Sequence, residues 1–386
     1  MIPRRAAATL SRFALGYPVL VVTGPRQSGK TTLVRASFGE KRYVSLESPN
    51  ERLFATEDPI GFLARFPDGA IIDEAQHCPA LFSYLQTRVD LDGRMGLFIL
   101  TGSQNFQLLA KVSQSLAGRA GLVQLLPFSL AELGAAGAPL GGLDDLLLRG
   151  LYPPLYDRPL DTAAWYGGYV ITYLERDVRQ IANVHDLNVF QRFLRLCAAR
   201  TAQLLNVSNL ATETGVSANT VRNWLSILEA SYIVHRLPPH YRNLGKRVVK
   251  TPKLYFTDPG LAAALMGIQT AEQLALHPHR GALFESLIVA EFLKRRYDAG
   301  LPSNLYFWRD NTGLEVDLLL EEGDTLSPIE MKSGQTYTAE MVAGLNQWLR
   351  YAGASAGFPC LIYGGDEGFR RLGVEVRSWR ESAAEA

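Results

Sequence analysis

Residues 24–31 read GPRQSGKT and directly follow the apolar run VLVV and one threonine. The spacing is that of a loop whose backbone N–H groups curl around phosphates: glycine, four residues, glycine, lysine and a hydroxyl residue. Lys30 would neutralise the charge of the terminal phosphates, and the Thr31 hydroxyl would hold Mg²⁺. A strand over 19–23 and a helix over 31–36 should flank the loop. The residues expected to bind the nucleotide are Gly24, Pro25, Arg26, Gln27, Ser28, Gly29, Lys30, Thr31 and Thr32.

A second motif, GAIIDEAQH, predicts an apolar strand over 70–72 that ends in two acids. Asp73 stands where a carboxylate on the metal side is needed, and Glu74 is placed to orient or deprotonate the attacking water. The strand-like run 42–46 lies between the loop and these acids, so we expect one strand to separate the two sites in the sheet. A glutamate directly after the aspartate favours hydrolysis of the nucleotide over transfer of phosphate to a small molecule.

The next apolar run, LFILTGSQN, ends in the polar residues Ser103, Gln104 and Asn105, which can sense a γ-phosphate. Apolar strands alternate with helical stretches as far as Phe128, which predicts an α/β domain with a parallel sheet covered on both faces. This order resembles the AAA+ ATPases, whose sensor residue ends the corresponding strand. The resemblance implies that Arg119 reaches into the site of a neighbouring subunit, in a homo-oligomer that we expect to be a hexameric ring. The alternative is an ordinary surface arginine.

The bulk composition sets the broad class. With 386 residues the chain is expected to form two or three domains. Lys and Arg number 39 against 38 Asp and Glu, a net charge of +1, so any surface for nucleic acid must be local. Three distant cysteines indicate a reducing compartment. No stretch reaches the roughly 18 uncharged apolar residues of a membrane span. We therefore expect a cytoplasmic protein with no membrane partner.

The middle of the chain has the spacing of a helix-turn-helix between residues 204 and 234. Ser208 and Ser217 are expected to cap its two helices, and Gly215 to make the turn between them. The second helix would present a mildly basic face to DNA. Its outward positions are Asn219, Arg222, Asn223 and Ser226.

A basic stretch follows, because no acid stands between Glu229 and Asp258. Its six positive residues are Arg236, Arg242, Lys246, Arg247, Lys250 and Lys253. The stretch would suit a β-wing that touches phosphates, which would make the middle a winged helix. A wing used for protein contact and a solvated basic hairpin are the alternatives. The predicted DNA contacts are Arg222, Arg242, Lys246, Arg247 and Lys250.

The last third predicts three strands joined by tight turns at 310–313 and 321–324. Strand alternation puts Glu315, Asp317 and Leu319 on one face, and the hairpin lets Asp317 and Glu330 converge. The upstream helix, in GALFESLIVAEFLKRR, is apolar almost all round. Glu285 within it is therefore costly to bury unless it is paired or binds a metal.

An acid followed by ExK after a hairpin resembles the PD-(D/E)xK nucleases, although Val316 stands where their signature has proline. The resemblance implies that Asp317, Glu330 and Glu285 hold Mg²⁺ and that Lys332 is catalytic, orienting water. Three alternatives stay open. The charges are a chance ExK on a solvated strand, the domain binds DNA without cutting it, or the domain is a working nuclease.

Residues 15–380 together resemble a widespread bacterial and archaeal family of AAA+ ATPases with a winged helix and a nuclease-like carboxy-terminal domain. The resemblance rests on GPRQSGKTT, IIDEAQHCP, LTGSQNF, SLAGR, YLERDV, LYFTDPGL, FESLIVAE, EVDLLL and IEMKSG. It implies an α/β chain of three domains. They are a P-loop AAA+ parallel-sheet domain at 1–150, a helical and winged-helix domain at 151–270, and an α/β restriction-endonuclease-like domain at 271–386.

The motifs together lead to two functional hypotheses. The first is a Mg²⁺-dependent ATPase that binds double-stranded, branched or broken DNA and remodels or translocates on it, with a carboxy-terminal nuclease-like domain that binds DNA and for which cleavage stays an open alternative. The alternative is a nucleotide-gated signalling or assembly switch that recruits protein partners. Glu74 and the lack of an acceptor pocket motif argue against a small-molecule kinase.

Overall fold

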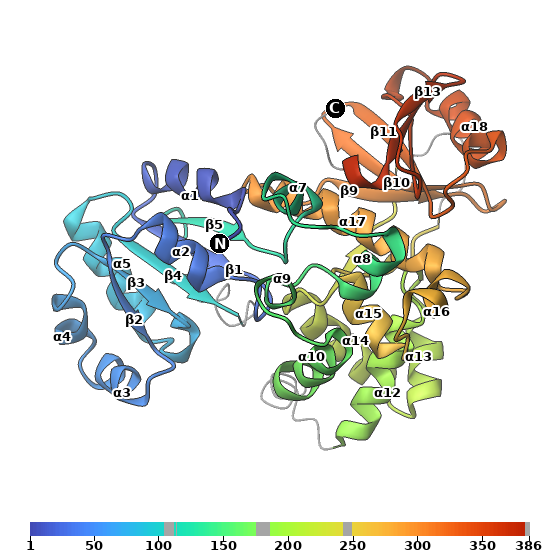
Figure 1. Cartoon of the computed structure of the whole chain (residues 1–386). Coiled ribbons are helices and arrows are strands. Elements are labelled where there is room, and N and C mark those ends of the chain that lie inside the picture. Colours follow the sequence, from blue (N-terminus) through green and yellow to red (C-terminus); the bar gives the residue numbers. More distant parts are fainter. Residues whose placement is uncertain (104–111, 113, 175–185, 242–248, 383–386) are drawn as a thin grey trace. The chain divides into compact units, whose positions relative to one another are not determined.

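The computed structural model describes residues 1–103, 112, 114–174, 186–241 and 249–382 (Figure 1). The chain divides into two compact units, each built from several segments. The first comprises Met1–Phe128, Ala230–Tyr232 and Arg296–Pro302. The second comprises Ser129–Glu229, Ile233–Arg295 and Ser303–Ala386. The predicted middle and carboxy-terminal domains therefore pack as one unit.

The first unit is built on a parallel sheet of five strands in the order β2-β3-β4-β1-β5 (Figure 1). One strand separates the loop strand β1 from the acid strand β3, as expected, but that strand is β4; β2 lies at the sheet edge. The connection from β1 leads to β2 at the edge of the sheet, and β3 and then β4 fill the positions between β2 and β1. The strands are β1 (Val19–Thr23), β2 (Arg42–Ser45), β3 (Ala70–Asp73), β4 (Phe98–Gly102) and β5 (Ala120–Gln124).

Both faces of this sheet are buried, since successive side chains of a strand point to opposite faces. Val19 and Val21 belong to one core cluster, with α4 and α5, whereas Leu20 and Val22 belong to the other, with α1 and α2. This double cover explains the continuous apolar runs of the sequence. The helices of this unit are α1 (Ala6–Ala14), α2 (Lys30–Ser37), α3 (Pro49–Glu57), α4 (Pro59–Ala64), the 3₁₀ turn η1 (Ala75–His77) and α5 (Leu81–Asp92).

Two distant segments complete the first unit. Tyr232 has a left-handed backbone (φ 59°), and its buried hydroxyl lies 2.7 Å from Thr23 Oγ1 and accepts a hydrogen bond from Gln124 Nε2 (3.0 Å). At Gly300 (φ +73°) a Cβ atom would lie 2.5 Å from the Phe13 ring. The end of the helix-turn-helix and the end of the long helix α17 (Arg280–Asp298) thus lead into segments that belong to the first unit.

In the second unit, the helix-turn-helix forms as predicted in position, with one different cap. Asn206, two residues before Ser208, caps the first helix by accepting from Asn209 N (3.0 Å). Gly215 ends that helix with φ 77°, and Ser217 Oγ accepts from Thr220 N (3.0 Å) at the start of the second. These helices are α13 (Val207–Thr214) and α14 (Ala218–Ala230).

A three-stranded sheet accompanies these helices, in the order β6-β8-β7. Its strands are β6 (Gln203–Leu204), β7 (Val234–Leu237) and β8 (Lys253–Phe256). The other helices of this region are α7 (Leu130–Ala135), α8 (Leu143–Arg149), α9 (Pro154–Asp157), α10 (Thr162–Tyr169), the π-helical turn η2 (Val170–Leu174), α12 (Leu187–Ala198), α15 (Pro259–Leu265) and α16 (Ala271–Ala275).

The carboxy-terminal sheet has six strands in the order β13-β14-β12-β11-β10-β9, and both predicted turns are present. β11, β12 and β14 run parallel, whereas β9 and β10 pair antiparallel. The elements are β9 (Leu305–Arg309), β10 (Glu315–Glu322), β11 (Thr325–Lys332), β12 (Cys360–Tyr363), β13 (Phe369–Arg371), β14 (Val374–Ser378), α18 (Ala343–Ala352) and the 3₁₀ turns η3 (Ala339–Val342), η4 (Gly353–Ser355) and η5 (Trp379–Glu381).

A β-bulge changes the faces of β10. Register with β9 shifts between Val316 and Leu319, which pair with Trp308 and Tyr306 respectively. Val316 and Leu319 therefore share the core under α18. The expectation that Leu319 shares a face with Asp317 is wrong, because the extra residue of a bulge breaks strict alternation.

The ends of the basic stretch lie along the edge of the carboxy-terminal sheet. His240 N donates to Phe307 O (2.7 Å), Phe307 N donates to Pro238 O (3.1 Å) and Val249 N donates to Arg309 O (3.0 Å). These backbone bonds extend β9 and join the two regions of the second unit. Within the described residues, no helix combines the length and the apolar character needed to cross a membrane.

Candidate functional site

The loop between β1 and α2 has a backbone that its glycines make possible. Gly24 has φ +152°, and a Cβ there would lie 2.0 Å from Leu125 O. Gly29 begins α2 in a left-handed conformation (φ 91°). Gln27 is also left-handed (φ 64°). The loop therefore curls at the amino-terminal end of α2, where the helix dipole and free N–H groups favour an anion.

The side chains of the loop fit a phosphate ligand. Lys30 is buried and its ammonium donates to Gly24 O (3.0 Å) and Pro25 O (2.8 Å), so it lies within the loop. The Ser28 hydroxyl is buried and has no hydrogen-bond partner among the described residues. Arg26 is half-buried, and Thr32 is exposed in the first turn of α2. A phosphate would give the Ser28 hydroxyl an acceptor.

Asp73 ends β3 with three hydroxyl groups directed at its carboxylate. Thr31 Oγ1 lies 3.0 and 3.2 Å from its two oxygens, Tyr43 donates to Oδ2 (2.7 Å) and Thr101 donates to Oδ1. Burial, followed by this bond to Asp73, raises the pKa of Tyr43 to about 12, so the phenol stays a neutral donor. All three partners are uncharged hydroxyl groups, so they orient the carboxylate without placing a positive charge beside it.

Thr31 and Asp73 fit Mg²⁺, because a hydroxyl and a carboxylate in contact are the hard oxygen ligands that this ion prefers. Both residues would hold the ion, which supplies positive charge beside the phosphates when bound.

Glu74 follows Asp73 with an unusual backbone, φ 53° and ψ 45°. A non-glycine residue in this region costs about 1–3 kcal/mol and persists only where its surroundings hold it. One carboxylate oxygen, Oε2, accepts from Gln76 Nε2, from Ser103 Oγ (3.1 Å) and from Ser103 N (3.4 Å). Glu74 is thus held beside the end of β4, and Ser103 contacts it there. The predicted sensor Gln104 lies outside the described residues.

Arg119 lies just before β5, at the amino end of the strands, opposite the edge that carries the loop and Asp73. Its guanidinium pairs with Asp90 of α5 through two contacts of 2.5 and 2.8 Å. From this edge it cannot act in the site of its own chain. Its predicted role can only be exerted on a neighbouring copy.

In the second unit the structure brings the predicted carboxy-terminal residues together. Lys332 Nζ lies 3.5 Å from Asp317 Oδ2 and also pairs with Glu330. Asp317 accepts a hydrogen bond from Met331 N (3.0 Å). Glu285 of α17 accepts from Tyr255 OH (3.1 Å). The convergence of Asp317 and Glu330 across the hairpin is confirmed.

The structure adds a residue to this cluster that the sequence analysis placed elsewhere. Lys253 of β8 is buried, and its ammonium pairs with Glu315 and lies 3.9 Å from Glu285 Oε2 and 4.0 Å from Asp317 Oδ1. Burial alone would lower the pKa of Lys253, but Glu285, Asp317 and Glu315 outweigh it and raise that pKa. The lysine therefore stays charged in the interior.

The acids of the cluster have raised pKa values. Burial, followed by the charge of Asp317, raises the pKa of Glu285 to about 8 and that of Glu330 to about 8. Nearby ammonium groups oppose both shifts. The burial of these carboxyl groups close to one another thus disfavours their charged forms, and the ammonium groups of Lys253 and Lys332 offset part of this effect.

The donor set of this cluster does not fit a resident Mg²⁺. Each oxygen of Asp317 faces a lysine ammonium, Oδ1 that of Lys253 and Oδ2 that of Lys332. Among the acids of this cluster, Glu330 Oε2 is buried without a hydrogen-bond partner within the described residues. With an ammonium beside each oxygen of Asp317, the cluster does not offer the octahedral oxygen set that Mg²⁺ requires. Consistently, the described residues contain no group of three His, Cys, Asp or Glu side chains arranged to hold a metal.

The predicted DNA contacts divide into two groups. Arg222 and Lys250 are exposed, whereas Arg242, Lys246 and Arg247 lie outside the described residues. Two other positive residues of the basic stretch are used internally, since Arg236 pairs with Glu229 (Nε to Oε2, 2.7 Å) and Lys253 is buried with acids. The stretch is therefore less available to a polyanion than its six charges suggest.

Some residues of both sites escaped sequence reasoning. Tyr43 and Thr101 reach Asp73 from adjacent strands, which only the sheet order reveals. Gln76 lies two residues after Glu74, and this proximity was a usable signal. Lys253 looked like part of a solvated basic stretch, and nothing local distinguishes it from Lys250. Long-range pairing alone identifies it.

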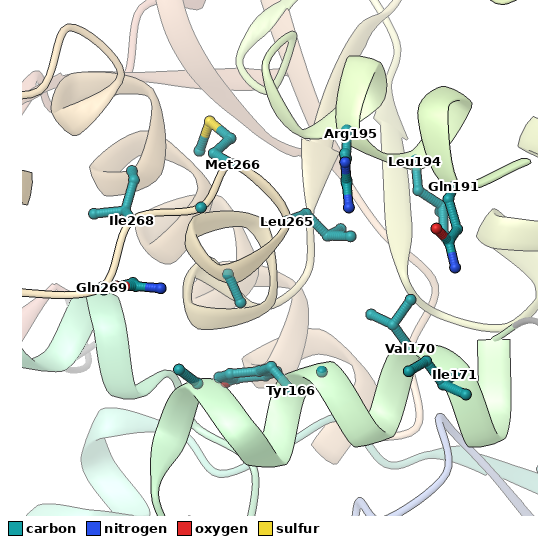
Figure 2. A pocket seen from close by; sticks show the side chains of 14 residues that line it. Tyr166, Val170, Ile171, Gln191, Leu194, Arg195, Leu265, Met266, Ile268 and Gln269 are labelled. Atoms are coloured by element: carbon teal, nitrogen blue, oxygen red, sulfur yellow. The ribbon is translucent and has the colours of Figure 1, made fainter. Parts of the chain in front are cut away.

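A cavity of about 610 Å³ lies elsewhere in the second unit, between α10, η2, α12 and the end of α15 (Figure 2). Leu194, Val170 and Leu265 line it with apolar groups, while Gln191 and Arg195 add polar ones. None of the predicted site residues lines it.

Comparison with known families divides the chain into three parts. Residues 16–134 match an AAA domain. Residues 141–272 match a domain of unknown function (DUF8612), and residues 280–380 match another domain of unknown function (DUF4143).

Two mycobacterial proteins described as uncharacterized are similar to most of the chain: Rv2008c of Mycobacterium tuberculosis and Mb2031c of Mycobacterium bovis. Each is 34% identical over 343 residues, which is 87% of this chain and 75% of the relative.

Solved structures show a partial likeness. The Walker-type ATPase PABY2304 of Pyrococcus abyssi is 17% identical with a TM-score of 0.48, over 69% of this chain and 96% of that one. AMPPCP-bound DnaA of Aquifex aeolicus is 16% identical with a TM-score of 0.32, over 58% and 85%. The RuvB Holliday junction branch migration motor of Thermotoga maritima is 18% identical with a TM-score of 0.26, over 60% and 89%.

The AAA match coincides with the phosphate loop and the Asp73–Glu74 pair. The chain is an ATPase, and its amino-terminal sheet binds ATP. 

Changing Glu74 to Gln should keep nucleotide binding and remove hydrolysis, because the amide cannot accept a proton from water. We expect phosphate release to fall by at least about 10²-fold with an unchanged dissociation constant for a fluorescent ATP analogue. Lys30→Ala is the control that should lose binding itself. Normal turnover of the Glu74→Gln protein would contradict the assignment.

Changing Tyr43 to Phe should weaken the Mg²⁺ dependence of ATP hydrolysis, because Asp73 loses the hydroxyl that orients its Oδ2. Outer hydrogen bonds of this kind change metal affinity or activity by about 10-fold or more. A Mg²⁺ titration of phosphate release measures the effect, and Tyr84→Phe, at another tyrosine of the same unit, is the matched control. Identical titration curves for the two variants would show that Tyr43 does not position Asp73.

Proposed function

Because the chain belongs to the family of the uncharacterized mycobacterial proteins Rv2008c and Mb2031c and carries an AAA domain, we propose that it couples Mg²⁺-dependent ATP hydrolysis to the binding and remodelling of DNA. Branched or broken double-stranded DNA is the proposed substrate, and translocation along it is the proposed form of remodelling. The observation that carries the proposal is the exposed polar face of α14 in a chain that hydrolyses ATP.

The ATP site divides the chemistry among its residues. The loop N–H groups and the Lys30 ammonium bind the phosphates, and Thr31 and Asp73 hold the metal side. Glu74 orients a water molecule for attack on the γ-phosphorus and accepts its proton. Ser103, which bonds Glu74 through both its hydroxyl and its N–H, holds the carboxylate in place. After hydrolysis, the γ-phosphate would no longer contact Lys30 or lie beside Glu74 at this edge of the sheet.

The proposed DNA surface is the second helix of the helix-turn-helix. Arg222, Asn219, Asn223 and Ser226 are exposed on α14, while Val221, Trp224 and Leu225 are buried on its other side. The element order α12, β6, α13, α14, β7, β8 supports a winged helix, in which the helix at the position of α14 enters a groove of DNA. Exposed Lys250 would add a phosphate contact.

Assembly into a homo-oligomeric ring, a hexamer in our proposal, would give Arg119 its role. The residue lies at the sheet edge opposite its own nucleotide site, as an arginine donated to a neighbour must. Its pair with Asp90 is solvent-exposed and therefore weak enough to exchange for a phosphate.

The alternative proposal is a nucleotide-gated switch that recruits protein partners. Its specific support is that Arg236 and Lys253 form ion pairs with Glu229 and Glu315 of the same chain, which reduces the positive charge available to DNA. An ATPase rate that ignores DNA, with a protein partner retained only in the ATP state, would favour this alternative.

Arg222→Ala should weaken binding to duplex, forked and four-way DNA, because one cation is removed from the proposed interface. For a phosphate contact we expect the slope of log affinity against log salt to fall by about one. Fluorescence anisotropy measures the affinities, and Arg192→Ala, at an exposed arginine of α12, is the control. Failure of the unaltered protein to bind any of these DNAs, with no stimulation of its ATPase, would end the DNA proposal.

Mixing two inactive variants tests the role of Arg119 in assembly. Glu74→Gln removes the water-orienting group and Arg119→Ala removes the trans arginine, so each protein alone should hydrolyse ATP slowly. In mixed assemblies some sites combine an intact Glu74 with an intact Arg119 from the neighbour. Recovered phosphate release is the expected result. Full activity of Arg119→Ala alone would contradict the assignment.

A further inference from the structure

One cation of the carboxylate cluster in the second unit, the Lys253 ammonium, comes from the three-stranded sheet and not from the six-stranded sheet. Lys253 belongs to β8, whereas Glu315 and Asp317 belong to β10 of the six-stranded sheet. The Lys253 ammonium pairs with Glu315 and lies within 4.0 Å of both Asp317 Oδ1 and Glu285 Oε2. One ammonium thus faces three carboxylates that come from a helix and a strand.

The surroundings of this ammonium exclude a role in binding solvent or an external polyanion. The Lys253 side chain is 4% exposed, and its Nζ lies 5.5 Å from the centre of the Phe307 ring. A buried ammonium needs charged partners to remain ionised. Tyr255, two residues along the same strand, donates to Glu285 from the same direction. β8 therefore presents two donors to the acids.

The remaining charges of the cluster are also matched. Arg309 pairs with the second oxygen of Glu315 (3.1 Å), and Lys332 pairs with Glu330 and Asp317. Asp317 has the Lys253 ammonium 4.0 Å from Oδ1 and the Lys332 ammonium 3.5 Å from Oδ2. A divalent ion at this place would have to displace Lys253 or lie close to it, and like charges about 4 Å apart repel strongly in a protein interior.

We propose that the Lys253 ammonium is the resident cation of this cluster, where it takes the place that the resemblance to nucleases gives to Mg²⁺. The carboxy-terminal sheet therefore does not cleave DNA by a metal-dependent reaction. Its acids serve to fix β8 to β10 and α17 instead. The inference does not depend on whether the chain binds DNA.

The inference predicts that neutralising Lys253 creates a divalent-cation site. Mn²⁺ is the probe, and the loss of the free-ion EPR signal reports binding. All proteins carry Asp73→Asn and are free of nucleotide, so that the ATP site contributes little. Lys253→Met should bind Mn²⁺ at least about tenfold more tightly than the chain with Lys253, since the repulsion of the ammonium is gone. Adding Asp317→Asn should abolish the gain, and the control Lys250→Met should show none.

Two results would overturn the inference. One is Mn²⁺ binding by the chain with Lys253 that disappears on Asp317→Asn, because the cluster would then already be a metal site. The other is a folded Lys253→Met protein with no gain in affinity. If Lys253→Met does not fold, Lys253→Met with Glu315→Gln removes the ammonium together with its nearest partner and keeps Glu285, Asp317 and Glu330 as donors. The same two outcomes then decide.

Discussion

The second unit depends on one buried charge. Lys253 sits among Glu285, Glu315 and Asp317, and the backbone bonds of the basic stretch to β9 run beside it. Removal of one partner from a buried ion pair typically costs about 3–5 kcal/mol, because the others remain buried and unpaired. Separating the three-stranded sheet from the six-stranded sheet would therefore leave the Lys253 ammonium and its carboxylate partners unpaired. This cost explains why the predicted middle and carboxy-terminal domains pack as one unit.

The two acidic sites of the chain differ in how their charge is compensated. Around Asp73 the partners are hydroxyl groups of Thr31, Tyr43 and Thr101, which orient the carboxylate without neutralising it. Around Asp317 the partners are ammonium groups. The surroundings of Asp73 therefore favour binding of a metal ion, whereas those of Asp317 disfavour it. The two sites thus differ in the type of donor around the central aspartate, which is hydroxyl at Asp73 and ammonium at Asp317.

Local patterns predicted what local chemistry decides. The strand 19–23, the turn at Gly215 and the cap at Ser217 follow from apolar runs and turn residues, and the structure has them. What depends on distant partners was not predictable in the same way. The strand between the loop and Asp73 is β4, the bulge in β10 moves Leu319 to the other face, and Lys253 is internal. For Asn206 and Ser208 the difficulty was different, because two good capping residues stand within one turn.

Two segments from later in the chain, Ala230–Tyr232 and Arg296–Pro302, belong to the first unit, so the two units alternate along the sequence. Tyr232 bonds Thr23 and Gln124, and Gly300 packs on Phe13, from stretches more than 100 residues downstream of the sheet they complete. A gene fragment that stops at residue 128 would encode the five strands and all the phosphate-binding residues. It would not encode the two segments, with Tyr232 and Gly300, that complete the packing of the unit. The ATPase unit is therefore not one continuous stretch of the chain, and a fragment of residues 1–128 would lack two of its three segments.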